Sequence, residues 1–153
     1  MAKNCKIDVQ AIKELEDQLK SFRDGQVQQF IDSCAKELTA RLLAKTVKRT
    51  PVGQYPKNSG KKGGTLRRGW TAGKQAAEYI DHLQIHHNGF NTVIEITNPT
   101  PYASYVEYGH RTKNGAGWVE GRFMLTKSAE EIQNAAPQII EAKLKKELGG
   151  IFK

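Results

Sequence analysis

The four histidines are the residues whose side chains could bind a metal ion. His82, His86 and His87 fall in a segment predicted as a β-strand, and His110 lies alone in a later loop. Neighbouring residues of a strand point to opposite faces, and His82 would lie about 13 Å from His86 along the strand. No Cys-x-x-Cys or His-Glu-x-x-His spacing accompanies these residues. We therefore interpret them as surface histidines and expect no metal site.

Phosphate binding is the second chemistry to consider, because segment 60–65 (GKKGGT) is rich in glycine and lysine. A P-loop requires a glycine five residues before its Gly-Lys pair and a serine or threonine after it, where this chain has Tyr55 and Lys62. No serine lies in a nucleophile-elbow pattern, and neither Cys5 nor Cys34 has a catalytic partner recognisable in the sequence. We expect neither a cofactor nor enzymatic activity.

A group of aromatic residues interleaved with glycines is the stronger sign of function. Its members lie between residues 102 and 123: Tyr102, Tyr105, Tyr108, Trp118 and Phe123. Three interpretations remain open, and we rank them as core first, anchors of a protein–protein interface second, and a stacking platform for single-stranded nucleic acid third. Stacking is ranked last because it would require basic residues between the rings, where this chain has Glu107 and Glu120.

Positive charge is concentrated in one part of the sequence. The 153 residues include 24 Lys and Arg and 16 Asp and Glu, for a net charge of +8. Residues 38–77 hold ten basic and no acidic residues, so the remainder of the chain, with 14 basic and 16 acidic residues, is slightly acidic. Four of the ten end a predicted helix, where the helix dipole favours cations: Arg41, Lys45, Lys48 and Arg49. The segment favours either a solvated surface or an acidic partner such as nucleic acid.

The first half of the chain is predicted to contain two helices and a long loop. Apolar periodicity predicts a helix over residues 7–23, with Asp8 as its N-cap, and Gly25 separates it from a longer helix over 26–49. Thr50-Pro51 ends that helix, and 51–65 is a loop with four glycines, two prolines and three lysines. Segment 66–71 is compatible with a short strand that turns Trp70 inward.

The second half is predicted to contain a β-hairpin and a long helix. Residues 82–87 and 92–97 alternate around a turn at 88–91, and 102–108 is either a short helix or a third strand. A glycine-rich loop covers 110–117. A last helix spans 122–148, with a kink near Pro137. This is an α+β fold with a small antiparallel sheet, and residues 1–153 form one domain without a membrane span.

Three short strings occur in a recognisable order. The first string has two parts, residues 50–52 (TPV) and 66–70 (LRRGW). The second is residues 102–111 (YASYVEYGHR), and the third, residues 121–125 (GRFML), opens the last helix. These strings resemble the "TPV … G-x-L-R-x-(S/G)-W", "YA-x-YVEYGH" and "PGRFML" stretches of a family of small tailed-phage proteins. The namesake of the family is the tenth gene product of phage Hong Kong 97. This chain departs from the pattern at Glu120, where the family has proline, and at 53–64, where a lysine-rich loop replaces a short turn.

The resemblance implies a non-enzymatic virion protein, made in the bacterial host cytoplasm, that forms a ring at the head–tail junction. The ring would be a hexamer or dodecamer acting as a neck, tail-completion or tail-terminator component through which DNA passes. Its implied partners are copies of itself, connector or adaptor proteins, and tail-tube or terminator proteins, with non-specific contact to double-stranded DNA as a further possibility and no membrane.

Two sets of site residues follow from these arguments. The expected subunit or partner interface consists of Trp70, Tyr105, Tyr108, His110, Arg111, Trp118 and Phe123. The expected contacts to DNA or to an acidic partner are Lys57, Lys61, Lys62, Arg67 and Arg68. The alternative function is a small basic nucleic-acid-binding module that uses residues 41–74.

Overall fold

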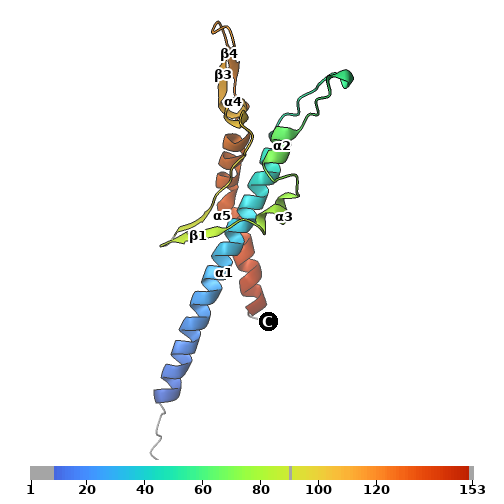
Figure 1. Ribbon diagram of the computed structural model, residues 1–153. Helices are drawn as coiled ribbons and strands as arrows, with labels where there is room; N and C mark the ends of the chain where they lie inside the picture. The colour runs from blue at the N-terminus through green and yellow to red at the C-terminus, as the bar shows by residue number, and fades with distance from the viewer. Residues whose placement is uncertain (1–8, 90, 152–153) are drawn as a thin grey trace, which may run out of the picture.

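The computed structural model describes residues 9–89 and 91–151. Two long helices form its body: α1 (Val9–Arg49) and α5 (Met124–Ile151). Figure 1 shows them side by side with opposite chain directions, and α1 projects beyond the other described elements at its N-terminal end. The N-cap predicted at Asp8 lies outside the described residues.

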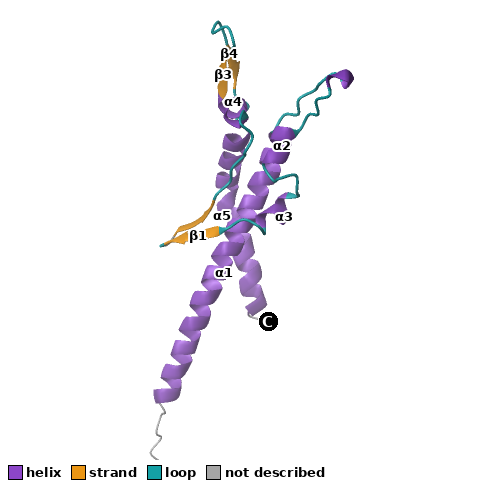
Figure 2. Cartoon of the chain, viewed as in Figure 1, coloured by secondary structure: helices purple, strands orange, loops and turns teal. Residues whose placement is uncertain are grey.

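Short elements complete the fold. In chain order they are the 3-10 turn η1 (Lys57–Ser59), α2 (Thr65–Gly69), α3 (Ala76–Ile80), β1 (Ile85–Asn88), β2 (Asn91–Ile94), α4 (Ala103–Tyr108), β3 (Gly109–Arg111) and β4 (Trp118–Glu120). Strand β1 pairs with β2 and β3 with β4, both antiparallel, in two separate sheets. Figure 2 shows how small these sheets are beside the helices. The predicted α+β class is therefore confirmed, with two hairpins where one was expected.

The two helices predicted at the N-terminus are one continuous helix. Gly25 lies inside α1, and a Cβ at this position would have no neighbour within 4 Å. A glycine in a helix interior costs only about 1 kcal/mol relative to alanine, so neighbouring turns carry the helix through it. The predicted end is correct, because α1 stops at Arg49 and Thr50 donates its backbone N–H to the Thr46 carbonyl at 2.9 Å.

Two other segments differ from their predictions. Residues 65–69 form helix α2 rather than a strand, although Trp70 does point inward, with 4 % of its surface exposed. Residues 110–111 belong to strand β3, so the second loop is shorter than expected. Pro137 lies inside α5 without ending it, and the kink expected there stays a prediction.

The core lies where the two long helices meet the short ones. It consists of Leu43, Leu66, Trp70, Ile80 and Met124, so α1, α2, α3 and α5 all contribute to it. Leu43 and Met124 are completely buried, whereas Val27 and Ile31, two apolar residues of α1, are exposed. At these two positions, which lie N-terminal to the core in α1, no described element covers the helix.

Two arms extend from one end of this body (Figure 1). The loop arm is residues 51–64, which leave the C-terminal end of α1 and return to α2. The hairpin arm is residues 109–122, which contain β3 and β4 and lead into α5. The candidate site residues outside the core lie on or beside these arms.

Candidate assembly interface

The hairpin arm is attached to the body by the buried carboxylate of Glu107. This side chain is 5 % exposed, and its Oε2 accepts the Leu125 backbone N–H at 3.0 Å. Its Oε1 accepts the backbone N–H of Thr126 at 2.9 Å and the hydroxyl of the same residue at 2.8 Å. The first N–H groups of a helix lack intrahelical acceptors, and negative charge is favoured there. Glu107 of α4 therefore caps α5 and fixes the two helices to each other.

The backbone around Gly121 completes this attachment. A Cβ on Gly121 would overlap the carbonyl oxygen of Glu107, so only glycine allows the chain to pass this close. Next to it, Arg122 donates its N–H to the Val106 carbonyl at 2.8 Å, and Phe123 donates to Glu107 at 3.0 Å. Phe123 has a φ of +49°, a strained value for a residue with a side chain, which these contacts hold in place. The second and third sequence strings thus form one rigid joint.

This joint leaves several large aromatic side chains exposed. Tyr105, Tyr108 and Trp118 are 57 %, 62 % and 59 % exposed, and Phe123 is also accessible. For these four side chains the interpretation ranked first, burial in the core of the monomer, is wrong. The physical reason is that α4 turns Val106 and Glu107 toward the body, which leaves the tyrosines on either side in solvent.

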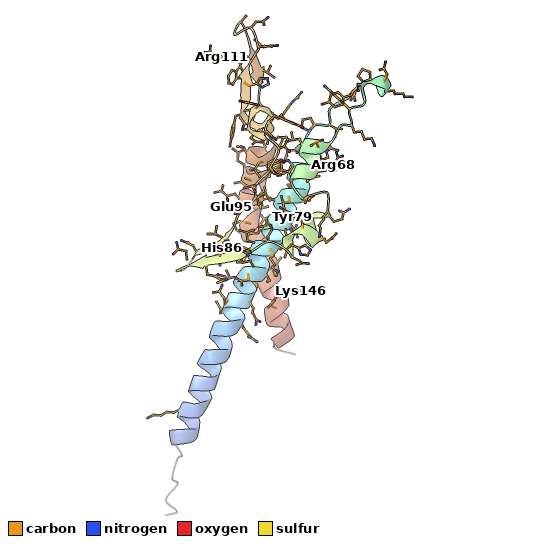
Figure 3. The ribbon with its side chains drawn as sticks, viewed as in Figure 1. Arg68, Tyr79, His86, Glu95, Arg111 and Lys146 are labelled. Carbon is orange, nitrogen blue, oxygen red and sulfur yellow. The ribbon has the colours of Figure 1, made fainter. Side chains whose placement is uncertain are left out.

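His110 and Arg111 lie on the same arm in strand β3. The imidazole ring of His110 is half-buried, with its centroid 5.7 Å from that of Tyr105, and its Nδ1 is buried without a hydrogen-bond partner among the described residues. Arg111 is exposed and lies on the hairpin arm, as Figure 3 shows. The structure thus brings six of the seven expected interface residues together on or beside this arm.

Trp70 is the seventh, and the structure places it in the core instead. Its indole Nε1 donates to the hydroxyl of Thr50 at 2.9 Å, and that hydroxyl donates to the Thr46 carbonyl at 2.7 Å. Arg67, which was expected to contact DNA or an acidic partner, donates from Nε and Nη2 to the Thr50 carbonyl at 3.0 and 2.6 Å. The expectation for Trp70 is corrected because its ring is buried in the core, and both side chains satisfy polar groups at the C-terminal end of α1. Residues 50–52 and 66–70, the first sequence string, therefore form another joint, which lies at the base of the loop arm.

The loop arm carries the other expected contacts. Lys57, Lys61 and Lys62 are exposed along it, and Arg68 is exposed where it meets α2 (Figure 3). The outgoing and returning chains touch, because a Cβ on Gly63 would overlap the carbonyl oxygen of Gly53. Three further local contacts order the arm. The Ser59 hydroxyl and N–H donate to the Pro56 carbonyl at 2.7 and 3.0 Å, and the Lys61 ammonium lies 5.9 Å from the centre of the Tyr55 ring.

Three of the four basic residues at the end of α1 form ion pairs. Lys45 Nζ lies 2.8 Å from Glu131, and Arg49 pairs with the same carboxylate. These hydrogen bonds, first from Lys45 and then from Arg49, lower the pKa of Glu131 below its usual value. Arg41 pairs with Glu37 at 2.8 Å and, together with Lys143, lowers the pKa of that carboxyl. Two charges of the basic segment therefore hold α5 against α1, and a third pairs within α1.

The histidines show no arrangement for metal binding. Strand β1 begins at Ile85, so His82 lies before it rather than in it, whereas His86 and His87 are exposed on adjacent strand positions. Nδ1 of His87 lies 3.2 Å from the Gln28 amide of α1. Within residues 9–89 and 91–151, no group of three or more His, Cys, Asp or Glu side chains could hold a metal ion. In the same ranges, no helix has both the length and the hydrophobicity needed to cross a membrane.

More than half of the chain matches a known protein family. A family model described as "Bacteriophage HK97-gp10, putative tail-component" matches residues 13–109, well over half of the chain. The protein belongs to the HK97-gp10 family. Comparisons with curated proteins and with solved structures give no match.

Membership in the HK97-gp10 family identifies a bacteriophage tail component and indicates a structural role and a location in the virion. The match includes the first sequence string and most of the second, through Gly109, but ends before the third. The third string is nevertheless part of the same joint in this structure, through Gly121 and Phe123.

The residue that sequence reasoning missed is Glu107. It was considered only as an argument against nucleic-acid stacking, yet it makes the contacts that hold the hairpin arm on α5. A capping residue normally lies next to the helix that it caps, whereas Glu107 lies 18 residues from Leu125. The one available signal was its position as an acidic residue surrounded by tyrosines, which a buried, hydrogen-bonded carboxylate would explain.

Proposed function

We propose that this HK97-gp10 family protein forms a ring at the head–tail junction, as a neck, tail-completion or tail-terminator component that joins connector proteins to tail proteins. The observation that carries the proposal is the exposed aromatic surface on and beside the hairpin arm, formed by Tyr105, Tyr108, Trp118 and Phe123. The family membership supports the tail-component role on which it builds.

An aromatic surface of this kind favours a protein partner. Tyrosine and tryptophan are enriched among the residues that contribute most to binding energy, and their rings lose little conformational entropy when they are buried. The joint at Glu107 and Gly121 holds these side chains on a fixed support, which lowers the cost of ordering them at an interface.

A ring gives such a surface a partner in every copy. Its contacts are heterologous, so one face of a subunit docks on a different face of the next, and the rotation must close. A hexamer or dodecamer is the form we propose, with connector and tail proteins above and below it. We assign the subunit or partner contacts to the aromatic side chains together with His110 and Arg111, and we leave out Trp70 because it is buried in the monomer.

The test is a charge placed in the aromatic surface. Tyr108→Asp should prevent ring formation while the monomer stays folded, because the tyrosine side chain is exposed and supports no other element. The matched control is Val93→Asp, which places the same charge on an exposed apolar position of β2. Circular dichroism reports folding, light scattering reports the mass of the assembly, and cryo-electron microscopy of particles reports position.

We expect Val93→Asp to assemble like the wild-type protein and Tyr108→Asp to remain monomeric and to yield particles without joined tails. A single copy of the protein in each intact virion would contradict the ring. Normal assembly of Tyr108→Asp would show that the hairpin arm is not the interface.

A further inference from the structure

The exposed positive charge of the folded chain does not coincide with residues 38–77, where the sequence concentrates its basic residues. In α1, Arg41 pairs with Glu37 of the same helix, and Lys45 and Arg49 pair with Glu131 of α5. The excess remains on residues 51–68 and 109–122, the two arms with helix α2. These segments hold one acidic residue, Glu120, and eight basic residues: Lys57, Lys61, Lys62, Arg67, Arg68, Arg111, Lys113 and Arg122.

The hairpin arm contributes basic residues that lie far from residues 38–77 in the sequence. Arg111, Lys113 and Arg122 are exposed. The hairpin arm that carries them extends from the same end of the body as the loop arm (Figure 1). Among the described residues, no ion pair involves a basic residue of either arm. The rest of the described chain holds 13 basic and 14 acidic residues, so the charge of the molecule is polarised toward this end.

We infer that the two arms together bind the phosphate backbone of double-stranded DNA without reading its sequence. This inference deepens the proposed role, because it names what the arms of such a ring contact as DNA passes. Several lysines and arginines on separate supports, with no fixed hydrogen-bonding geometry toward a base edge, match phosphate contact rather than base recognition. The loop arm is ordered by the Gly53–Gly63 contact, so its lysines are held away from the body before DNA arrives.

An acidic protein is the other partner with complementary charge, and the composition of the loop arm disfavours it. Lysine is depleted in protein–protein interfaces, whose centres require apolar anchors. The three exposed lysines of the loop arm outnumber its two large exposed apolar residues, Val52 and Tyr55, and the Lys61 ammonium lies over the Tyr55 ring. Contact with phosphates requires only positive charge that releases counterions.

The experiment measures binding of the full chain to a fluorescent DNA duplex by anisotropy between about 50 and 200 mM salt. Two variants remove two charges from one arm each: Lys61→Gln with Lys62→Gln, and Lys113→Gln with Arg122→Gln. The matched control, Lys145→Gln with Lys146→Gln, removes two charges from α5, and Figure 3 shows Lys146 far from both arms. Light scattering of each sample reports the oligomer.

We expect wild-type binding to weaken steeply with salt and to be equal for duplexes of different sequence. Each arm variant should lower the slope of log K against log salt by about two, whereas the control should leave it near the wild-type value. The inference is overturned if the wild-type protein does not bind at low salt, or if the control loses as much affinity as the arm variants.

Failure of this inference and failure of the proposed function are separable. Arm variants that assemble rings and bind DNA like the wild type, but no longer join tails, would assign the arms to an acidic protein instead. Salt-dependent DNA binding without any ring would contradict the proposed function and leave the phosphate contact standing.

Discussion

The two arms leave the same end of the molecule but are built from different chemistry. The hairpin arm is fixed by a buried carboxylate and, with the residues at its base, exposes large aromatic rings beside its basic residues, whereas the loop arm is fixed by a close backbone approach and exposes mainly lysines. The way in which each arm is held in place therefore fits the kind of side chain that it exposes. Aromatic anchors gain affinity only if they are held in position, and phosphate contacts tolerate a mobile side chain.

The bases of the arms also differ. Trp70 and Arg67 close the loop-arm base on the hydroxyl and the carbonyl of Thr50, directly after α1, and Glu107 closes the hairpin-arm base on the first N–H groups of α5. Both joints satisfy groups that a helix end leaves without partners. They are linked through Arg49, whose Nη1 donates to Ser128 of α5 at 2.9 Å.

The largest expected effect concerns the two tryptophans. Trp70→Ala should lower the free energy of unfolding by about 3–5 kcal/mol, because it leaves a cavity in the core and removes the donor to Thr50. Trp118→Ala should change it by less than about 0.5 kcal/mol, because that ring is on the surface. Urea unfolding measures both. Equal losses would mean that Trp118 is part of the core of the monomer.

The next effect tests the base of the hairpin arm. Glu107→Ala should lower the free energy of unfolding by about 2–3 kcal/mol, since two backbone N–H groups and the Thr126 hydroxyl lose their acceptor in a buried site. Glu120→Ala, on exposed strand β4, is the control and should be close to neutral. If both variants unfold at the same urea concentration as the wild type, Glu107 is not the joint.

Two glycine substitutions compare the arms directly. Gly121→Ala should cost about 1–3 kcal/mol, because the new Cβ meets the carbonyl of Glu107 inside the joint. Gly63→Ala meets a carbonyl as well, yet the loop arm lies in solvent and can open without disturbing the core. We expect it to leave global stability within about 1 kcal/mol of wild type and to speed tryptic cleavage after Lys61 or Lys62. A global loss as large as that of Gly121→Ala would contradict the comparison.

The sequence predicts the elements of this fold better than it predicts the joints. Thr50-Pro51 marks the end of α1 correctly, and alternation finds the β1–β2 hairpin, because both signals are local. Gly25 misleads because its helix-breaking effect is small beside the turns on either side. Glu107 acts on residues 18 and 19 positions away, and no local pattern encodes that contact.

The candidate site shows the same limit. Aromatic spacing identifies Tyr105 and Tyr108, but whether such rings are buried depends on which side of α4 faces the body. Residues 38–77 do hold ten basic residues, but these residues do not form one exposed basic surface. The helical part of this segment meets Glu131 from the other end of the chain, and Arg111 joins the basic end from outside the segment.

The smallest expected effect is the pH dependence of the ion pairs that neutralise α1 below the arms. The pKa of Glu131 is lowered in the folded protein by Lys45 and Arg49, so its contribution to stability is complete above its unfolded value near 4.5. That contribution is lost as the pH falls through the lower folded pKa. Urea unfolding at pH 7 and at about pH 4 should therefore show a smaller acid-induced loss for Glu131→Gln than for the wild type. Glu130→Gln, the neighbouring exposed position, should behave as the wild type does.

If Glu131→Gln loses as much stability as wild type on acidification, the carboxylate does not stabilise the α1–α5 contact. The basic end of α1 would then be counted with the arms as part of the surface that we propose to contact DNA.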